Sequence, residues 1–505
     1  MTTFILIITC LFLLICYSFF FKKPKDGFKL PPSPPSLPII GHLHFLLSSL
    51  THKSLQKLSS KYGPLLHLRI FNVPVIFVSS ASVAYEIFRA HDINISFRGN
   101  PPIYESLLVG SSGFFTAPYG DYWKFMKKLI VKKFLGLHAL DRSRGIRADE
   151  LRRFYMSLLD KAMKNESVEI AMEAMKLTNN TVCKMIMGRN LSEENGEAER
   201  VRDLVTESTA LTMKIFVANM FHKPLKKLGI SLFKKEIMGV SCRFDEVLEK
   251  ILEEHEEKLE EDHDMDLLDK LLASYRDKNT EYKFTRNHIK SLFVDLLVAG
   301  TDTSRHATQW TLAEIINNPK VLERLREEID TVVGKTRLIQ ETDIPKLPYL
   351  SSVVKEGLRL HPPGALFART SREGFRIRGF YVPENTPLVV SAYAVMRDPD
   401  SWEDPNEFKP ERFLDSSRSG EEDEREHAFK YIPFGGGRRG CPGVNLAYIF
   451  LGTAIGVMVQ CFDWKIKGDK VNMEEAPRAL VLTMAHPLNC IPVSRTPSLF
   501  SNMQI

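Results

Sequence analysis

The fold is decided by one glycine-rich stretch, Pro433-Phe434-Gly435-Gly436-Gly437-Arg438-Arg439-Gly440-Cys441-Pro442-Gly443. Its glycines allow the backbone to turn tightly and to approach a flat ligand closely. Pro442 suits the first position of a helix, and an apolar run follows from Val444 to Phe462. Cys441 is therefore predicted at a helix N-terminus, where backbone N–H groups and the helix dipole favour a thiolate.

Two other interpretations of this stretch exist. A lone cysteine is more often a small buried hydrophobic residue, and a glycine run can bind phosphate, although the Lys-Ser/Thr of a P-loop is absent here. The full spacing F-G-x-G-x-R-x-C-x-G, completed by Ala447, resembles the haem-binding loop of the cytochrome P450 family. This resemblance implies that Cys441 is the thiolate ligand of haem iron, and that Phe434, Arg439 and Gly443 help to bind the haem.

Further segments carry the same resemblance along nearly the whole chain. Glu356-Gly357-Leu358-Arg359 places an acid and a base three residues apart on one helix face, and Pro410-Glu411-Arg412-Phe413 follows it. Alone, such a pair is usually a surface salt bridge of little energetic value. The resemblance implies instead that Glu356, Arg359 and Arg412 form a buried structural network behind the haem.

Another such segment is Ala299-Gly300-Thr301-Asp302-Thr303-Ser304, inside an apolar helix predicted from about Asn287 to Asn317. Polar residues in such a helix are costly unless they are used. The Thr303 hydroxyl can bond back to the carbonyl of Ala299 and bend the helix, which would open a groove for dioxygen. Asp302 and Thr303 are the predicted catalytic residues, a relay that delivers protons together with water. A bend with a satisfied threonine is the alternative.

The two haem carboxylates need cationic partners. By resemblance, the candidates are Arg439, Arg369 and the helix that carries Trp123. The family pattern W-x-x-x-R reads Trp123-Lys124-Phe125-Met126-Lys127 here, so lysine replaces arginine. Lys127 offers one charged hydrogen bond but not a bidentate fork, so its contact with haem is less secure than that of Trp123.

The same segment is strongly basic, with lysines at positions 124, 127, 128, 132 and 133. A solvated helix face is one interpretation of this pattern. The family resemblance implies the other, a docking face for an acidic flavoprotein, the NADPH-cytochrome reductase, which electrostatic attraction would steer into place.

By resemblance, the substrate pocket is lined by Phe114, Phe115, Thr116, Val298, Ala299, Ala365, Leu366, Phe367, Leu480 and Val481. These side chains are chiefly apolar with few hydrogen-bond donors, which suits a lipophilic ring system. The chain resembles the plant microsomal group of cytochromes P450. Within that group it is most similar to a subfamily that includes triterpene-modifying members of a thalianol-type pathway. A triterpenoid is the expected substrate, and a flavonoid, as for flavonoid hydroxylases of the same family, is the nearest alternative.

The N-terminus is predicted to be a membrane anchor. Phe4 to Phe21 is an apolar, charge-free run that spans ~27 Å as a helix, close to the thickness of a bilayer core. Lysines at positions 22, 23 and 25 follow, which places the rest of the chain in the cytosol. A cleaved signal peptide is the alternative, but a basic n-region and a small-x-small site are absent. Residues 1–21 are thus the expected single-pass anchor in the endoplasmic reticulum membrane, 22–41 a basic and proline-rich hinge, and 42–505 a single catalytic haem domain.

Composition and periodicity agree with this division. The net charge of +6 over 505 residues includes no concentrated basic footprint, so no nucleic-acid partner is expected. The cysteines are odd in number and unpatterned, which argues against a disulfide framework. Strand signals at Leu65–Ile70, Pro74–Val78, Phe375–Tyr381 and Pro387–Ser391 surround mostly helical periodicity. The expected fold is mainly α with a minor β region, the cytochrome P450 haem-thiolate fold with an N-terminal transmembrane helix.

The resemblance implies a monooxygenase that binds haem b and takes electrons from NADPH through a separate reductase. It would hydroxylate or desaturate a lipophilic plant specialised metabolite. Two rival functions are a haem-thiolate isomerase or dehydratase that uses peroxides, and a non-catalytic haem sensor. The intact Asp302-Thr303 pair argues against the first rival, and the apolar pocket segments argue against the second.

Overall fold

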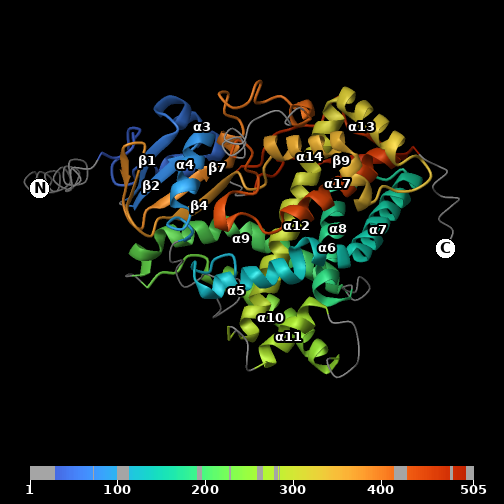
Figure 1. Cartoon of the computed structure of the whole chain (residues 1–505), viewed down its shortest axis with the longest axis horizontal. Helices are drawn as coiled ribbons and strands as arrows, with labels where there is room; N and C mark the ends of the chain where they lie inside the picture. Colours follow the sequence, from blue (N-terminus) through green and yellow to red (C-terminus); the bar gives the residue numbers. More distant parts are fainter. Residues whose placement is uncertain are drawn as a thin grey trace, which may run out of the picture. The chain divides into compact units, whose positions relative to one another are not determined.

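The computed structural model describes residues 29–71, 73–98, 113–189, 196–226, 229–258, 266–277, 282–283, 285–414, 429–477 and 481–495 (Figure 1). The chain forms two compact units. The sheet unit comprises the described parts of 1–99, 365–405 and 420–440, and the helical unit comprises those of 100–364, 406–419 and 441–505. The predicted anchor at 1–21 lies outside the described residues, as does Leu480.

A four-stranded sheet organises the sheet unit, in the order β1-β2-β7-β4. Its strands are β1 (Leu65–Ile70), β2 (Val73–Val78), β7 (Pro387–Ser391) and β4 (Leu366–Thr370). β1 and β2, which match the two predicted strand signals, form an antiparallel hairpin, and β7 runs parallel to β2. Because side chains alternate along a strand, Ile76 and Val78 share a buried cluster with α4 (Ala81–His91), whereas Val75 and Phe77 share another with α3 (Thr51–Tyr62).

The single strand predicted at Phe375–Tyr381 is wrong, because this segment is a hairpin of β5 (Phe375–Ile377) and β6 (Phe380–Val382). The chain reverses at Arg378 and Gly379, whose φ angles are 48° and 78°. Two consecutive left-handed residues match the twist of a tight hairpin. The sheet unit also contains α2 (Leu43–Leu46), α15 (Ala392–Val395) and the short helix η4 (Gly437–Arg439).

The proline-rich segment is tied to the sheet unit along its described length. Backbone N–H groups of β6 and β1 donate to the carbonyls of Lys29 and Pro32, each at 2.8 Å. The buried His42 accepts a hydrogen bond from the Arg69 N–H at Nδ1 (2.8 Å), and its Nε2 lies 2.9 Å from the Pro34 carbonyl. A neutral ring that donates from Nε2 satisfies both contacts. Residues 29–41 therefore belong to the folded unit and are not an isolated spacer.

The long helix α12 (Arg286–Asn317) is the centre of the helical unit and packs along α8 (Ile170–Met187) (Figure 1). Thr285 caps it by accepting a hydrogen bond from the His288 N–H. The other helices are α5 (Asp121–Ile130), η1 (Val131–Leu135), α6 (Leu137–Arg142), α7 (Arg144–Met163), α9 (Glu197–Lys226), α10 (Lys234–Lys258), α11 (Leu267–Arg276), α13 (Pro319–Val332), η2 (Glu341–Lys346), α14 (Pro348–Leu360), η3 (Pro410–Phe413) and α17 (Val444–Cys461). A second sheet has the order β3-β9-β8, from β3 (Val168–Glu169), β9 (Asn489–Ser494) and β8 (Phe462–Lys465).

The helix predicted after the cysteine loop is α17. It ends at Cys461, one residue before the end of the predicted apolar run, because Phe462 begins β8. Among the described residues, α17 alone is long and apolar enough to cross a membrane, but 72% of it is buried inside the protein. Its side chains Leu446 and Phe450 belong to a buried apolar cluster of the helical unit. α17 is therefore a core helix.

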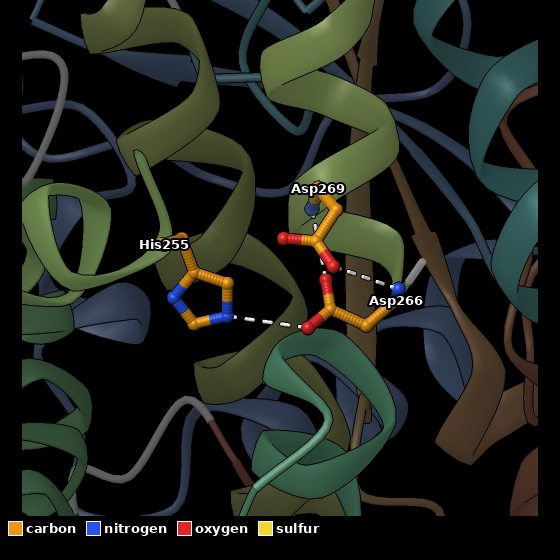
Figure 2. Close-up of side chains that lie close together, drawn as sticks. All are labelled: His255, Asp266 and Asp269. Carbon is orange, nitrogen blue, oxygen red and sulfur yellow. Dashed lines mark hydrogen bonds and ion pairs between the residues drawn. The ribbon is translucent and has the colours of Figure 1, made fainter. Parts of the chain in front are cut away.

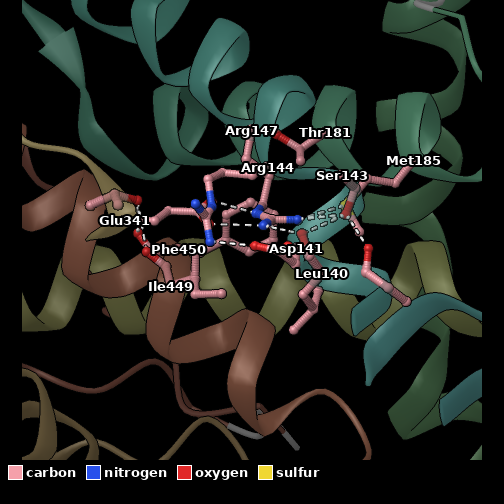
Figure 3. Close-up of polar contacts among 12 residues, drawn as sticks. Leu140, Asp141, Ser143, Arg144, Arg147, Thr181, Met185, Glu341, Ile449 and Phe450 are labelled. Carbon is pink, nitrogen blue, oxygen red and sulfur yellow. Dashed lines mark hydrogen bonds and ion pairs between the residues drawn. The ribbon is translucent and has the colours of Figure 1, made fainter. Parts of the chain in front are cut away.

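A buried ion pair joins two distant parts of the helical unit (Figure 3). The Arg147 guanidinium of α7 donates from Nε and Nη2 to the two carboxylate oxygens of Glu341 in η2. Arg147 also donates to the Leu140 carbonyl (2.6 Å) and to the Ser143 hydroxyl (2.7 Å), and its side chain is only 3% exposed. On the same helix, Arg144 forms an exposed pair with Asp141.

Arg147→Met should lower the free energy of unfolding by about 3 kcal/mol, because it leaves the Glu341 carboxylate partly buried without its cation. Arg144→Met is the matched control, since an exposed pair contributes only about 0–1 kcal/mol. Urea unfolding of both variants measures the difference. Equal destabilisation by the two substitutions would contradict a special contribution from the buried pair.

Candidate active site

Cys441 lies three residues before α17, whose N-cap is Gly443. The thiol remains accessible to solvent, and the backbone N–H of Gly443 forms a hydrogen bond with it. The surrounding protein raises the pKa of the Cys441 thiol by desolvation, and the Gly443 N–H only partly opposes this. The helix N-terminus therefore does not by itself produce the expected thiolate. Coordination of a metal would, because a thiol that binds a metal loses its proton.

A cluster of arginines occupies the sheet unit. Arg369 on β4 is 3% exposed and donates from Nη2 to the Arg439 carbonyl (3.3 Å), and Arg439 donates from Nε to the Ser96 carbonyl (2.9 Å). Burial, then the charges of Arg98 and Arg439, lower the pKa of Arg369 to about 9, and Asp92 opposes this shift only weakly. Such a concentration of buried guanidinium groups favours a carboxylate or phosphate ligand.

Asp92 binds the cysteine loop at Arg438. The Asp92 carboxylate accepts hydrogen bonds from the Arg438 backbone N–H (3.1 Å) and from Nη1 of Arg438 (2.6 Å). Gly437 has φ +67°, and a Cβ atom there would clash with the Asp92 side chain. Two of the loop glycines, Gly435 and Gly437, thus adopt left-handed backbone angles that other residues rarely adopt.

The predicted acid–base network forms within the helical unit. Glu356 and Arg359 on α14 are both 0% exposed, and Nε and Nη2 of Arg359 donate to the two Glu356 oxygens at 2.7 and 2.9 Å. Arg412 Nε and the Lys409 N–H add bonds to Oε1 of Glu356 at 3.0 and 2.9 Å. Arg359 also donates to the Glu407 carbonyl (3.1 Å). The network therefore joins α14 to the segment that leads into η3.

The glycine within this network has a packing role. A Cβ atom on Gly357 would overlap the Thr311 side chain of α12. The Thr311 hydroxyl donates to the Ala307 carbonyl at 2.7 Å, which fixes its position. Gly357 thus permits the close approach of α14 and α12.

On α12, the Thr303 hydroxyl donates to the Ala299 carbonyl at 2.6 Å. Asp302 is 2% exposed, and its Oδ1 accepts from Nε (2.8 Å) and Nη2 (2.7 Å) of Arg305. Nε2 of His306 lies 3.5 Å from the same oxygen. Burial would raise the pKa of the Asp302 carboxyl, but His306 and Arg305 together lower it. Asp302 is therefore held in an ion pair inside the helical unit.

The residues predicted to contact haem from α5 contact each other. Trp123 is buried and stacks on Phe114, with ring centroids 5.7 Å apart. The Lys127 ammonium lies 5.1 Å from the centre of the Trp123 ring. A cation–π contact of this kind orients the lysine along its own helix.

The predicted pocket residues fall in both units. In the helical unit, Asp295 Oδ2 on α12 accepts a hydrogen bond from the Phe115 N–H at 3.0 Å. This bond fixes the segment Phe114–Thr116 next to α12, one turn before Val298 and Ala299. Val481 pairs with Gly364 in an isolated bridge after α14. In the sheet unit, Ala365 precedes β4, which carries Leu366 and Phe367, and the Phe367 ring lies 6.2 Å from that of Phe88.

Comparison with known proteins decides the family. Residues 31–490 match the cytochrome P450 family. The chain belongs to the cytochrome P450 family. Cytochrome P450 705A22 of Arabidopsis thaliana is 65% identical over 500 residues, which cover 98% of this chain and 97% of the relative. Cytochrome P450 705A5 of Arabidopsis thaliana is 67% identical, with 97% of each chain covered. The 3,9-dihydroxypterocarpan 6A-monooxygenase of Glycine max is 38% identical, covering 97% of this chain and 98% of the relative.

As a cytochrome P450, the chain is an oxidoreductase that incorporates molecular oxygen, and family membership implies haem. The described residues fit haem. An accessible thiol suits iron, and a buried arginine cluster suits the two carboxylates of the porphyrin. The predicted similarity to a plant subfamily with thalianol-pathway members is confirmed by relatives of the 705A group, which are 63–67% identical to this chain.

Several residues around these sites were not predicted from the sequence of this P450. Asp92 and Arg98 precede the cysteine loop by more than 300 residues, so only the fold places them near Arg369 and Arg438. Arg305 and His306 directly follow the Asp302 segment. Their spacing of three and four residues from Asp302 is the sequence signal that would have identified them.

One cluster of this P450 has the composition of a metal site, His255, Asp266 and Asp269, whose ligand atoms lie within 4.8 Å of one another (Figure 2). Asp266 is the N-cap of α11 and exchanges hydrogen bonds with Asp269 in a capping box. His255 Nε2 lies 3.2 Å from Asp266 Oδ2, and its Nδ1 lies 2.8 Å from the Ile251 carbonyl. Helix capping accounts for this cluster.

His255 should give the helical unit a pH-dependent stability. Burial would lower its pKa, but Asp266 and the carbonyls of Ile251 and Met187 raise it overall. A raised pKa contributes stability that is fully present below the unfolded value of about 6.5 and is lost as the pH rises through the folded value. His255→Gln should therefore lower the urea midpoint more at pH 6 than at pH 9. A deficit that is equal at both pH values would contradict the ion pair.

Proposed function

We propose that this P450 is a haem-thiolate monooxygenase that takes electrons from NADPH through a separate reductase and hydroxylates or desaturates a lipophilic plant specialised metabolite, most specifically a triterpenoid. The proposal rests on the accessible Cys441, just before α17. The helical unit that contains Cys441 also contains α12, which carries the buried Asp302 next to Thr303. The anchor at 1–21 would hold the catalytic domain on the cytosolic face of the endoplasmic reticulum, and the basic face of α5 would receive the reductase.

In this proposal Cys441 binds the iron of haem b, while Arg369 and Arg439 bind the propionates. Phe434 and Gly443 flank the thiolate, and Trp123 and Lys127 contact the haem from α5. Bound haem would supply the oxygen chemistry, with Cys441 as its thiolate ligand. Glu356, Arg359 and Arg412 keep the structure rigid, because a fully satisfied buried network fixes one arrangement of the elements that it joins.

Proton delivery is the task proposed for α12. Two protons are consumed for each dioxygen that is cleaved, and a hydroxyl beside a carboxylate can pass them on. The Thr303 hydroxyl is anchored on the Ala299 carbonyl, so its oxygen can accept a proton-donating hydrogen bond from water. Asp302 would pass on the proton that enters next.

The substrate class rests on the apolar character of the pocket segments and on the 705A relatives. Phe114, Val298, Ala365 and Phe367 offer no side-chain donor, which favours a hydrocarbon skeleton over a polyphenol. The flavonoid alternative is favoured by one observation, the 38% identity to a pterocarpan monooxygenase. Incubation with the reductase, NADPH and panels of triterpenes and flavonoids, read by mass spectrometry, separates the two. Oxidation of flavonoids alone would overturn the triterpenoid assignment.

Thr303→Ala tests the proton relay. The variant should bind haem and carbon monoxide normally, but product formation should fall ~100-fold, because a misdirected proton releases oxygen as peroxide. The measurement is product formed per NADPH consumed at saturating substrate.

Thr308→Ala is the matched control for this test, since the Thr308 hydroxyl makes the same kind of bond to the Ser304 carbonyl (2.8 Å) on the same helix. If Thr303→Ala couples as well as Thr308→Ala, the Thr303 hydroxyl serves only to shape the helix.

The proposed topology has its own test. The chain should stay in the membrane fraction after a carbonate wash, with its C-terminus open to protease from the cytosolic side. A secreted chain, or one that begins after residue 21, would contradict the anchor.

A further inference from the structure

His306 on α12 is a buried histidine that makes no hydrogen bond within the described structure. Its side chain is 9% exposed, and neither Nδ1 nor Nε2 has a hydrogen-bond partner among the described residues. Two other buried histidines, His42 and His255, each use both ring nitrogens. A buried polar group without a partner costs about 1–3 kcal/mol, so an apolar residue at position 306 would be more stable. An exception of this kind calls for a functional reason.

The nearest acid to His306 is Asp302, one helical turn earlier. Nε2 of His306 lies 3.5 Å from Oδ1 of Asp302, slightly too far for a good hydrogen bond and close enough to become one with a small rotation. The other carboxylate oxygen, Oδ2, is buried and has no hydrogen-bond partner in the described part of the chain. Asp302 thus keeps unused hydrogen-bonding capacity beside an imidazole that also has unused capacity.

Arg305 fixes the position of the acid. It binds Oδ1 with two nitrogens, and its own Nη1 lies 3.3 Å from the Met175 sulfur of α8. The guanidinium favours the ionised carboxylate, which makes Asp302 a reluctant proton donor unless another group returns protons to it. Arginine cannot do so, because its guanidinium stays protonated. An imidazole can, because one ring nitrogen can accept a proton while the other releases one.

We propose that His306 is a second proton-carrying residue, which supplies protons to Asp302; this rests on the proposed role of Asp302 in oxygen cleavage. Both ring nitrogens are buried in this structure, so the step requires a water molecule to enter beside the ring. His306 then takes up a proton from that water at Nδ1 and releases the proton on Nε2 to the Asp302 carboxylate. The ring returns to its neutral form with the proton on the opposite nitrogen, and Asp302 becomes a carboxylic acid. After Asp302 has passed its proton on, the imidazole regains the starting tautomer by exchange with water.

The first test needs no turnover. The full-length protein, labelled with ¹⁵N-histidine, gives ring nitrogen resonances that report protonation and hydrogen bonding, and His306→Gln identifies those of His306. Asp302→Asn should shift both His306 resonances, and it should leave those of His288, at the start of the same helix, unchanged. Resonances of His306 that do not move in Asp302→Asn would overturn the pairing.

The second test measures coupling. A glutamine amide can form a hydrogen bond in the place of Nε2, yet it cannot carry a proton. His306→Gln should bind haem and carbon monoxide normally but lower product per NADPH about tenfold, and His306→Asn should do the same. His288→Gln is the matched control and should couple normally. Wild-type coupling in His306→Gln would mean that His306 only positions Asp302, which overturns the proposal.

The two proposals fail in different ways. If Thr303→Ala and Asp302→Asn lose coupling while both His306 variants keep it, the relay stands and His306 is not part of it. If Thr303→Ala and Asp302→Asn keep wild-type coupling, the proposed use of α12 itself fails.

Discussion

Cys441→Ser should reduce NADPH-dependent product formation to the level of a preparation that contains only the reductase. A serine hydroxyl stays protonated at neutral pH, and it does not supply the electron density with which a thiolate favours O–O cleavage. The replacement is more severe because the same partial desolvation that raises the pKa of the Cys441 thiol disfavours any anion there without a bound cation. The measurement is product formed with reductase, NADPH and oxygen in excess.

Cys461→Ser is the matched control, because Cys461 is a buried cysteine at the other end of the same helix α17. It should keep haem and most of the activity, with a modest loss of stability from a hydroxyl in an apolar site. Loss of product in both variants, or in neither, would show that the effect does not depend on the ligand position.

Glu356→Ala should prevent the accumulation of folded, haem-loaded protein. The substitution leaves Arg359, which is 0% exposed, and Arg412 without the carboxylate that both bind. Removing one partner of a buried ion pair costs about 3–5 kcal/mol, a large part of the total stability of a typical domain, about 5–15 kcal/mol. Haem content per chain and the yield of soluble folded protein after detergent extraction measure the effect.

Two controls separate this network from ordinary charge removal. Arg324→Ala removes a half-exposed partner of Glu411, so it should cost at most about 1 kcal/mol. Arg412→Ala keeps the bidentate pair of Glu356 and Arg359, so its effect should lie between the other two. Normal haem content in Glu356→Ala would contradict the structural role of the network.

The sequence predicted the local elements that depend on periodicity and on turn residues. The alternation at Leu65–Val78 predicts the β1–β2 hairpin, and the apolar run after Cys441 predicts α17 nearly to the residue. The hairpin of β5 and β6 was read as one strand, because Arg378 does not look like a turn residue. Only its left-handed φ of 48° and that of Gly379 reveal the reversal.

Contacts between distant segments were predictable only through the family resemblance. The motif E-x-x-R identifies Glu356 and Arg359, but the bond from the Lys409 N–H depends on where η3 packs. The resemblance led to Arg369 and Arg439, whereas the pKa of Arg369 depends also on Arg98 and Asp92, which lie far away in sequence. For Cys441, the sequence correctly predicted a position at the N-terminus of a helix. The sequence does not show that desolvation of the thiol opposes the effect of that helix N-terminus on its pKa.

The absorption spectrum of the reduced, carbon monoxide-bound protein shows whether Cys441 is the thiolate ligand of haem iron. The wild type should show the strongly red-shifted Soret band of thiolate-ligated haem, and Cys441→His, with its haem content measured, should bind haem without that band. A Cys441→His spectrum that keeps the red-shifted band, or a wild-type spectrum that lacks it at full haem content, would contradict the claim.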